Sequence, residues 1–223
     1  MISMLKVNAL CLGLLTISLP LKADILNLTS LEWPPYASEG VEQQGASVAV
    51  VKAAVEAMGH ELNVEFYPWE RAVHLAKNKP DYAGYFPEYY FEADDLLFSQ
   101  SIGTGPLGFV ENKSNPVTWS SLNDLKSINI GVVRGYVNTT ELDNMIANQE
   151  IKAVAVTSDS RNILKVAGKR IPLAVIDSNV LDYLLKSDPD IASAKDKVKM
   201  NSKLLEEKDL FVEVAKEKKG KKR

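Results

Sequence analysis

The alternation of strand-like and helix-like segments constrains the fold of this chain more than any other feature. Three short apolar segments are typical of strands, and two segments with apolar residues at helical spacing lie between them. In chain order these segments are 25–31, 48–58, 62–67, 69–78 and 81–86. Strands that alternate with helices in this way favour an α/β layer built on a parallel sheet.

The ends and the buried face of the first predicted helix follow from its residue types. Ser47 is a favourable N-cap residue, and Gly59 is a typical residue at a helix end. We expect one apolar face of this helix to be buried, formed by Val48, Val51, Val55 and Met58.

A second series of the same kind follows the glycine-rich segment 96–108, which is predicted to be largely irregular until a strand begins near residue 106. The predicted strands of this series are 106–111, 128–133, 153–157, 173–176 and 209–216. The predicted helices are 121–125, 139–148, 159–167 and 179–186. Two α/β units joined by extended segments predict two lobes with a ligand cleft between them. We assign lobe 1 to 24–108, completed by 209–223, and lobe 2 to 109–208.

Residues 1–23 have the three-part layout of a secretory signal peptide. Lys6 precedes an apolar run from Val7 to Leu19, and Ala23 ends the segment. The run is too short for a comfortable membrane span, although an uncleaved anchor is the alternative. The only cysteine, Cys11, lies in this run, so a processed chain has neither a thiol nor a disulfide. We therefore expect a periplasmic protein that is secreted through a cleavable signal peptide.

The charge distribution argues against a nucleic-acid partner. The chain has a net charge of −3, and six of its 26 basic residues lie in the tail between Lys216 and Arg223, so the rest of the chain is more acidic still. We interpret the tail as a solvated end, and a role at a membrane surface or on a polyanion is the alternative.

The stretch 131–142, "GVVRGYVNTTEL", predicts a strand, a glycine turn and a helix start. Asn138 and Glu141 have the spacing of a capping box, and Gly135 permits close approach to the backbone. Free amides at such a helix start attract anions, and Thr139 or Thr140 offers a hydroxyl donor. The stretch is therefore either a plain helix cap or a site for a carboxylate, and it lacks the lysine pattern of a nucleotide-binding loop.

Four segments together resemble a known family, the bacterial extracellular solute-binding proteins of family 3, the polar amino-acid type served by ABC transporters. The segments are "EWPPY", "GASVAVVKAAVEAMG", "DYAGYFPEYYFEADDLLFS", and "SLNDLKSINIGVVRGYVNT" with "LAVIDSNVLDYLL". The resemblance implies a two-lobed, periplasmic-binding-protein-like (type II) α/β fold with a two-strand hinge. It also implies that a ligand closes the lobes and that the membrane subunits of an ABC transporter bind the closed form.

The resemblance also assigns roles to particular residues. The turn from Gly135 to Thr139 would bind the ligand's α-carboxylate, and Asp177 would bind its ammonium group, although Asp177 is also a typical helix N-cap. The family's carboxylate-binding arginine is replaced here by Glu92. Either Arg71 or Arg134 takes its place, or the ligand is cationic or is not an α-amino acid.

Aromatic residues near the predicted strand ends complete the candidate site. They either form a wall of the cleft that stacks on a cation, or they belong to the core. The candidate ligand-binding residues are Trp33, Tyr36, Trp69, Arg71, Tyr85, Arg134, Gly135, Tyr136, Asn138, Thr139 and Asp177.

The sequence offers little support for an enzyme. His60 and His74 lack metal-ligand spacing, and no G-x-S-x-G motif is present. We predict no cofactor and no metal, and a monomer that captures a small, amino-acid-like polar solute. The alternatives are a periplasmic sensing module and a dehydratase that acts on prephenate-like acids, with Glu92 as a cleft acid.

Overall fold

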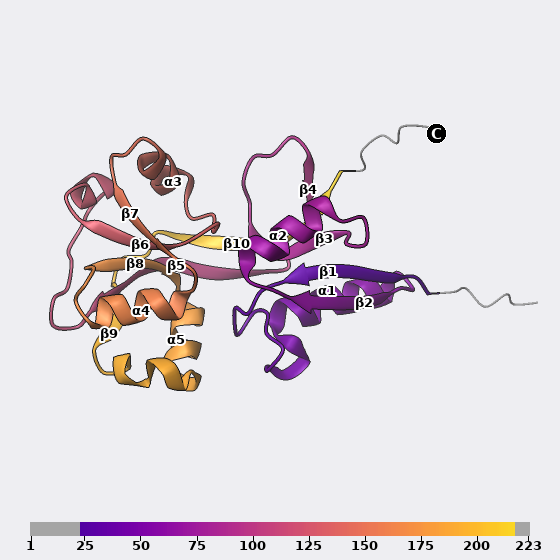
Figure 1. Ribbon diagram of the computed structural model, residues 1–223, viewed down its shortest axis with the longest axis horizontal. Coiled ribbons are helices and arrows are strands. Elements are labelled where there is room, and N and C mark those ends of the chain that lie inside the picture. The colour runs from indigo at the N-terminus through magenta and orange to yellow at the C-terminus, as the bar shows by residue number, and fades with distance from the viewer. Residues whose placement is uncertain (1–22, 217–223) are drawn as a thin grey trace, which may run out of the picture.

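The computed structural model describes residues 23–216, and it shows two α/β lobes joined by two long strands (Figure 1). The predicted signal peptide, apart from Ala23, and the basic tail beyond Lys216 lie outside the described residues. Among residues 23–216, no helix has both the length and the hydropathy that a membrane crossing requires.

The first lobe is built on a small parallel sheet. Strand β1 lies between β2 and β3, with Leu28 opposite both Val64 and Gly84, so the predicted parallel layer is confirmed. The elements of this lobe are β1 (Ile25–Ser30), η1 (Glu42–Gln44), α1 (Ala46–Ala57), β2 (Glu61–Phe66), α2 (Trp69–Asn78), β3 (Gly84–Tyr89) and β4 (Leu96–Phe98).

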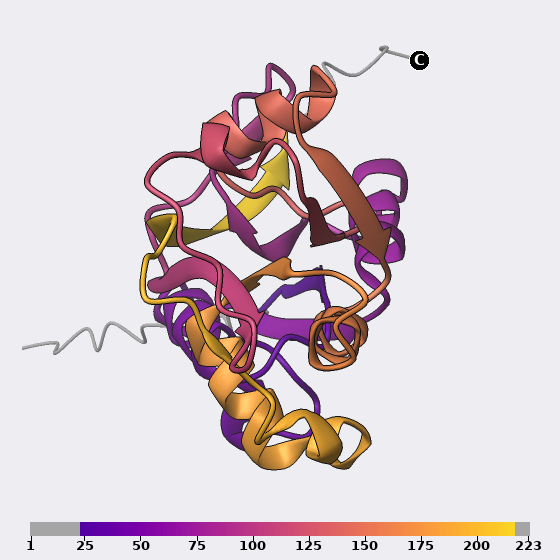
Figure 2. The same ribbon diagram turned by 90° about the vertical axis from the view of Figure 1, so that its left-hand side faces the viewer.

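The second lobe has helices on both faces of its strands. Helix α3 covers one face, and α4 and α5 cover the other (Figures 1 and 2). The elements of this lobe are η2 (Leu122–Leu125), β6 (Asn129–Val133), α3 (Thr140–Ala147), β7 (Lys152–Val156), α4 (Asp159–Ala167), β8 (Leu173–Asp177), α5 (Ser178–Ser187), η3 (Pro189–Ala194) and β9 (Val198–Met200).

Two ten-residue strands, β5 (Gly103–Asn112) and β10 (Glu206–Ala215), connect the lobes. They pair with each other in antiparallel fashion where they cross, from Leu107 opposite Glu206 to Gly103 opposite Leu210. Beyond the crossing, β5 pairs with β8 and β10 pairs with β3, so one sheet runs through the molecule in the order β2-β1-β3-β10-β5-β8-β6-β7. This arrangement is the two-strand hinge that the resemblance implied, and the assigned lobe boundary at residue 108 lies within β5.

Apolar packing holds each lobe together. In the first lobe, Val48, Val51 and Val55 of α1 pack with Leu28 and Phe86 of the sheet. Each such side chain contributes roughly 1.5–3 kcal/mol when it is fully buried. A second, larger cluster fills the second lobe and extends across the junction to Leu31, Trp33 and Trp69 of the first lobe, so the two lobes share a contact surface of apolar side chains.

The first helix differs from its sequence prediction at both ends. Its N-cap is Gly45, whose φ of 103° suits glycine, because a Cβ there would overlap the backbone of Tyr36. Ser47, predicted as the cap, is buried in the first turn instead, and Met58 is 63% exposed at the C-cap rather than on the buried face. The connection to the Tyr36 loop therefore decides where this helix begins.

The segment from 81 to 108 is also more ordered than predicted. The third strand covers 84–89 rather than 81–86, and all six of its residues are buried. Strand β4 and the start of β5 lie inside the stretch that was expected to be irregular. Pairing with β10 explains both differences, because it is a long-range contact that local residue preferences do not show.

Candidate functional site

A groove of about 450 Å³ lies between the lobes. The loop after β1 and the junction of β2 with α2 supply its first-lobe side. The loop after β6, the junction of β7 with α4, and part of α5 supply its second-lobe side. The groove thus lies beyond the carboxyl ends of parallel strands in both lobes, where ligands of α/β proteins usually bind.

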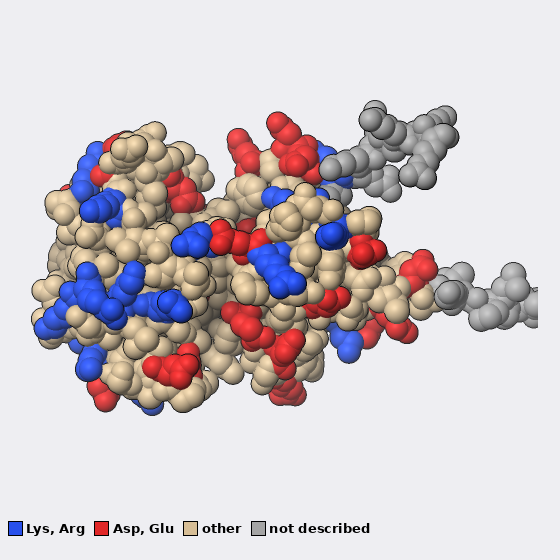
Figure 3. Space-filling view, viewed as in Figure 1, with Lys and Arg blue, Asp and Glu red and all other residues tan. Residues whose placement is uncertain are grey.

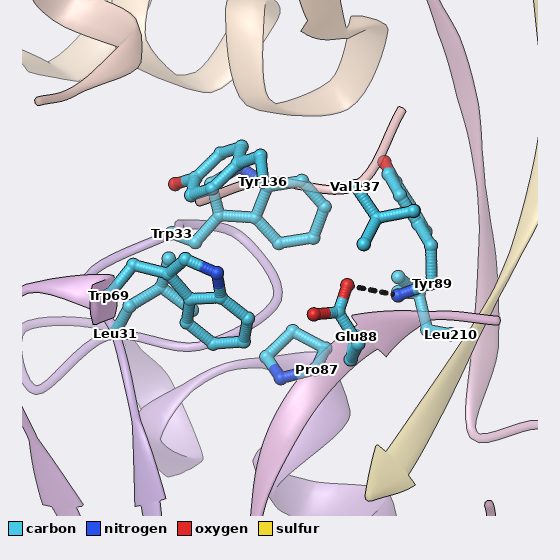
Figure 4. Close-up of a pocket in the computed structure, with 9 residues that line it drawn as sticks. All are labelled: Leu31, Trp33, Trp69, Pro87, Glu88, Tyr89, Tyr136, Val137 and Leu210. Atoms are coloured by element: carbon cyan, nitrogen blue, oxygen red, sulfur yellow. Dashed lines mark hydrogen bonds between the residues drawn. The ribbon is translucent and has the colours of Figure 1, made fainter. Parts of the chain in front are cut away.

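Three aromatic rings from the two lobes meet in this groove. Tyr136 of the second lobe lies edge-on to Trp33 and to Trp69 of the first lobe, with ring centroids 6.5 Å and 6.0 Å apart. Behind these rings is a cavity of about 20 Å³, room for about one water molecule, into which Glu88 points (Figure 4). The predicted residues Trp33, Trp69 and Tyr136 therefore come together, and they form the inner wall of the groove.

Local structure holds the aromatic residues of the first lobe in place. The loop after β1 closes on itself through the bond from Trp33 N to Ala37 O, 2.7 Å long. The ring of Trp33 stacks on that of Tyr36 at a centroid distance of 4.8 Å. Pro68 is the N-cap of α2, so that Trp69 begins the helix at the junction with the second lobe.

Tyr36 and Asp177 form a buried polar contact between the lobes. The Tyr36 hydroxyl donates toward the Asp177 carboxyl, at 3.2 Å and 3.1 Å from its two oxygens, and accepts from Nδ2 of Asn179 at 2.8 Å. Gly105 of the hinge strand lies against this contact, and a Cβ there would overlap both the Tyr36 hydroxyl and Asp177 Oδ2. The contact therefore joins the two lobes beside the hinge strand.

Asp177 is also the N-cap of α5. Its Oδ1 accepts from the backbone N–H groups of Asn179 and Val180. Burial raises the pKa of Asp177 to about 6, although these two bonds and the bond from Tyr36 act in the opposite direction. Its carboxyl is thus occupied by contacts within the protein, and it lines neither the groove nor the small cavity behind it.

The turn before α3 makes further contacts with the first lobe. Trp69 Nε1 donates to the carbonyl of Gly135 at 3.0 Å, and Arg134 lies 3.9 Å from Glu70. Both side chains of this ion pair are more than half exposed, so we expect it to contribute little to stability. The bond from Trp69 joins the start of α2 to the turn, and it places Tyr136 at the lobe junction.

The structure corrects the predicted cap of α3. Thr139 is the N-cap and accepts from Leu142 N, whereas Asn138 donates from its backbone and from its side chain to the Asp143 carboxylate. Tyr136 N donates to Val133 O. Several N–H donors of this turn therefore already make hydrogen bonds within the second lobe. The turn places the ring of Tyr136 in the lining of the groove. Thr139 faces a separate pocket beside Trp119.

Two other predicted residues lie outside the groove. Arg71 is exposed on α2, 5.0 Å from the ring centroid of Tyr67. Tyr85 is 1% exposed within β3, and its ring packs edge-on against Trp69. The structure therefore places Tyr85 in the core that supports the aromatic wall.

Two buried carboxyls near the groove were not singled out from the sequence. Burial raises the pKa of Asp159 to about 7, and the charge of Asp177 adds to the effect. Burial likewise raises the pKa of Glu88 to about 8, while the bond from Tyr89 N opposes the shift. Asp159 is the first residue of α4, after its N-cap Ser158, and follows the end of β7 at Val156 by three residues. The argument that singled out Asp177, an acid after a strand, therefore applies to it as well.

No cluster of metal-binding side chains stands out near the groove. Within the described residues, no three His, Cys, Asp or Glu side chains come together in a way that could hold a metal ion.

Comparison with solved structures identifies the fold. The sequence matches no protein-family model and no curated protein. Its structure is similar to the GluR0 ligand-binding core from Nostoc punctiforme in complex with L-glutamate, at 15% identity and a TM-score of 0.66, over 86% of this chain and 85% of that one. It is also similar to the arginine-bound form of truncated ArgBP from T. maritima, at 18% identity and a TM-score of 0.67, over 86% and 89% of the two chains.

A third similar structure is a histidine kinase sensor domain with similarity to periplasmic binding proteins. Its TM-score is 0.72 at 13% identity, over 88% of this chain and 84% of that one. These three structures confirm the two-lobed, periplasmic-binding-protein-like α/β fold that the sequence resemblance implied.

Proposed function

We propose that this protein captures a small polar solute in the groove between its lobes and delivers it to an ABC transporter from the periplasm. The observation that carries the proposal is the groove itself. It lies beyond strand ends of both lobes, next to a two-strand hinge, and is lined by side chains of both lobes. A solute that contacts both walls favours the closed arrangement and so shifts an open–closed equilibrium.

The contacts between the lobes support this mechanism. The bond from Trp69 to Gly135 and the contact of Tyr36 with Asp177 both join one lobe to the other, so they exist only when the lobes are close. Two of the similar solved structures hold a bound amino acid, L-glutamate in one and arginine in the other. This supports an amino acid or a related compound as the solute.

The proposal is tested by mass spectrometry of the small molecules released when the purified protein is denatured. We expect one compound in near-stoichiometric amount, and we expect it to rebind to refolded protein in a calorimetric titration. Release of no compound, together with no heat from a panel of amino acids, amines and small acids, would refute solute binding.

A sensing module is the second candidate, because one similar structure is a histidine kinase sensor domain. A sensor and a transport protein both bind a solute, so uptake distinguishes them. Deletion of the gene abolishes uptake of the released compound if the protein serves a transporter, and leaves uptake unchanged if it serves only a signalling partner.

A further inference from the structure

The side chains that line the groove include acids and no bases within the described part of the chain. Glu32 and Glu39 are exposed first-lobe residues, and Asp159 is the buried acid of the second lobe. Arg134 and Arg161 do not line the groove itself but an adjoining surface depression, which shares Thr157, Ser158 and Ser160 with it. Figure 3 shows a group of basic side chains on the second lobe, and a further basic group at the lobe junction beside acidic side chains. The charge inside the groove is therefore negative.

Asp159 lies in the groove without a basic partner among residues 23–216. It is 6% exposed, and the donors that act on its carboxyl are the Trp33 indole and its own backbone N–H, both uncharged. The indole N–H of Trp33 faces it and lowers its pKa, yet this N–H is itself buried without a hydrogen-bond partner. An ionised carboxylate at such a depth is costly unless a positive charge lies beside it.

The aromatic wall supplies the other half of a cation site. Trp33, Trp69 and Tyr136 line the groove, and so does Tyr67, whose ring centroid lies 5.0 Å from the guanidinium of Arg71. Ring faces attract cations electrostatically, with roughly 2 kcal/mol or more at desolvated sites.

Asp177 adds negative charge close to Asp159. Its charge raises the pKa of Asp159, so the two carboxyls lie near enough to interact. Glu88, behind the aromatic wall, adds little charge at neutral pH because burial raises its pKa to about 8. The negative potential of the groove therefore comes from Asp159, with a contribution from Asp177.

From this arrangement we propose that the groove binds a small organic ammonium cation, with Asp159 as its counter-charge and Trp33, Trp69 and Tyr136 as its aromatic wall. The inference rests on the proposed function, because it names the chemical class of the solute. It also accounts for the absence of a carboxylate clamp, since Glu92 is exposed and both Arg71 and Arg134 lie outside the groove.

The test is a set of calorimetric titrations at pH 8 with four probes. Choline and putrescine carry quaternary and primary ammonium groups, 3,3-dimethylbutan-1-ol is the uncharged isostere of choline, and L-glutamate is an anionic amino acid. Asp159→Asn removes the counter-charge with little change in shape, and Asp190→Asn, at an exposed residue outside the groove, is the matched control. Thermal unfolding monitors the fold of both variants.

We expect choline or putrescine to bind. If choline is the better ligand of the two, its uncharged isostere should bind at least 100-fold more weakly than choline. Asp159→Asn is expected to weaken binding of the better cation by 10-fold or more, and Asp190→Asn by less than twofold. Equal affinity of wild type and folded Asp159→Asn, or binding of neither ammonium compound, would overturn the inference. Tight binding of L-glutamate alone would also overturn it, but would leave the proposed solute-binding function standing.

The pH dependence gives a second readout. Burial gives Asp159 a pKa of about 7, and the groups that face it are Asp177, Tyr89, Tyr136 and Trp33. A cation binds the ionised form better, so its affinity should rise between pH 6 and pH 8. We expect this rise to be much smaller in Asp159→Asn, and an identical rise in that variant would contradict the assignment of Asp159.

Discussion

The buried Glu88 should make the stability of the protein depend on pH, by an amount that follows from its environment in the structure. Its carboxyl points into the small cavity behind the aromatic wall, is 6% exposed and accepts from Tyr89 N at 2.7 Å (Figure 4). Burial raises its pKa from 4.5 to about 8. In the folded protein this group therefore holds its proton over a range of pH in which the unfolded chain has lost it.

The sign of the effect on stability follows from proton binding. Because the folded state binds more protons between pH 4.5 and pH 8, the free energy of unfolding falls as the pH rises through that window. The free energy of unfolding that is lost by pH 8 and above is about 5 kcal/mol, from the difference between 4.5 in the unfolded chain and about 8 in the folded protein. Glu88→Gln keeps the shape and the acceptor for Tyr89 N but cannot ionise, so this loss should disappear.

The assay is urea unfolding of wild type and Glu88→Gln at pH 5, 7 and 9. We expect similar stability at pH 5 and an advantage for the variant that grows to about 5 kcal/mol at pH 9. Glu92→Gln changes the same chemical group at an exposed position and is the control, with no pH-dependent advantage. An identical pH dependence in wild type and Glu88→Gln would refute the assignment of a buried, neutral Glu88.

Three further substitutions probe the hinge, the sheet and the second lobe. Tyr36→Phe removes the hydrogen bond to Asp177 and should weaken ligand affinity roughly 10-fold in a calorimetric titration, with the helix signal in circular dichroism unchanged. Unchanged affinity would contradict a role of this contact in closure of the lobes. Gly84→Ala would push a Cβ into the backbone of Glu213 across the β3–β10 pair and should lower the free energy of unfolding by about 3 kcal/mol. An unchanged midpoint of urea unfolding would contradict this clash. Asn201→Ala removes the donor to the buried Glu111 and the acceptor of Trp119 Nε1 and should cost about 2–4 kcal/mol, which thermal unfolding measures.

Much of the fold was predictable from the sequence because local patterns agree with it. The alternation of strands and helices correctly indicated the parallel layer of the first lobe, and Pro68 correctly marked the start of α2. The strand β4 and the full length of β5 and β10 were not predicted, because they depend on pairing between residues about 100 positions apart. The same is true of the start of α1, which the Tyr36 loop determines.

The candidate site was predictable only in part. Trp33 and Trp69 were identified as aromatic residues near predicted strand ends, and Tyr136 as part of the glycine turn before α3. The structure brings all three to one groove. Asp177 was identified by its place after a strand, yet its carboxyl is engaged by Tyr36 and by the start of α5. Asp159 occupies the same kind of position, and only the packing of the lobes shows that it, rather than Asp177, faces the groove.

The central claim is that the two lobes close over a small solute about the hinge of β5 and β10. Small-angle X-ray scattering tests it most directly, on protein freed of bound small molecules by denaturation and refolding, before and after the released compounds are returned. We expect the radius of gyration to fall on return of the compounds, to the value calculated from the closed structure. Identical scattering curves in the two samples, in the presence of measurable binding heat, would contradict closure of the lobes on the solute.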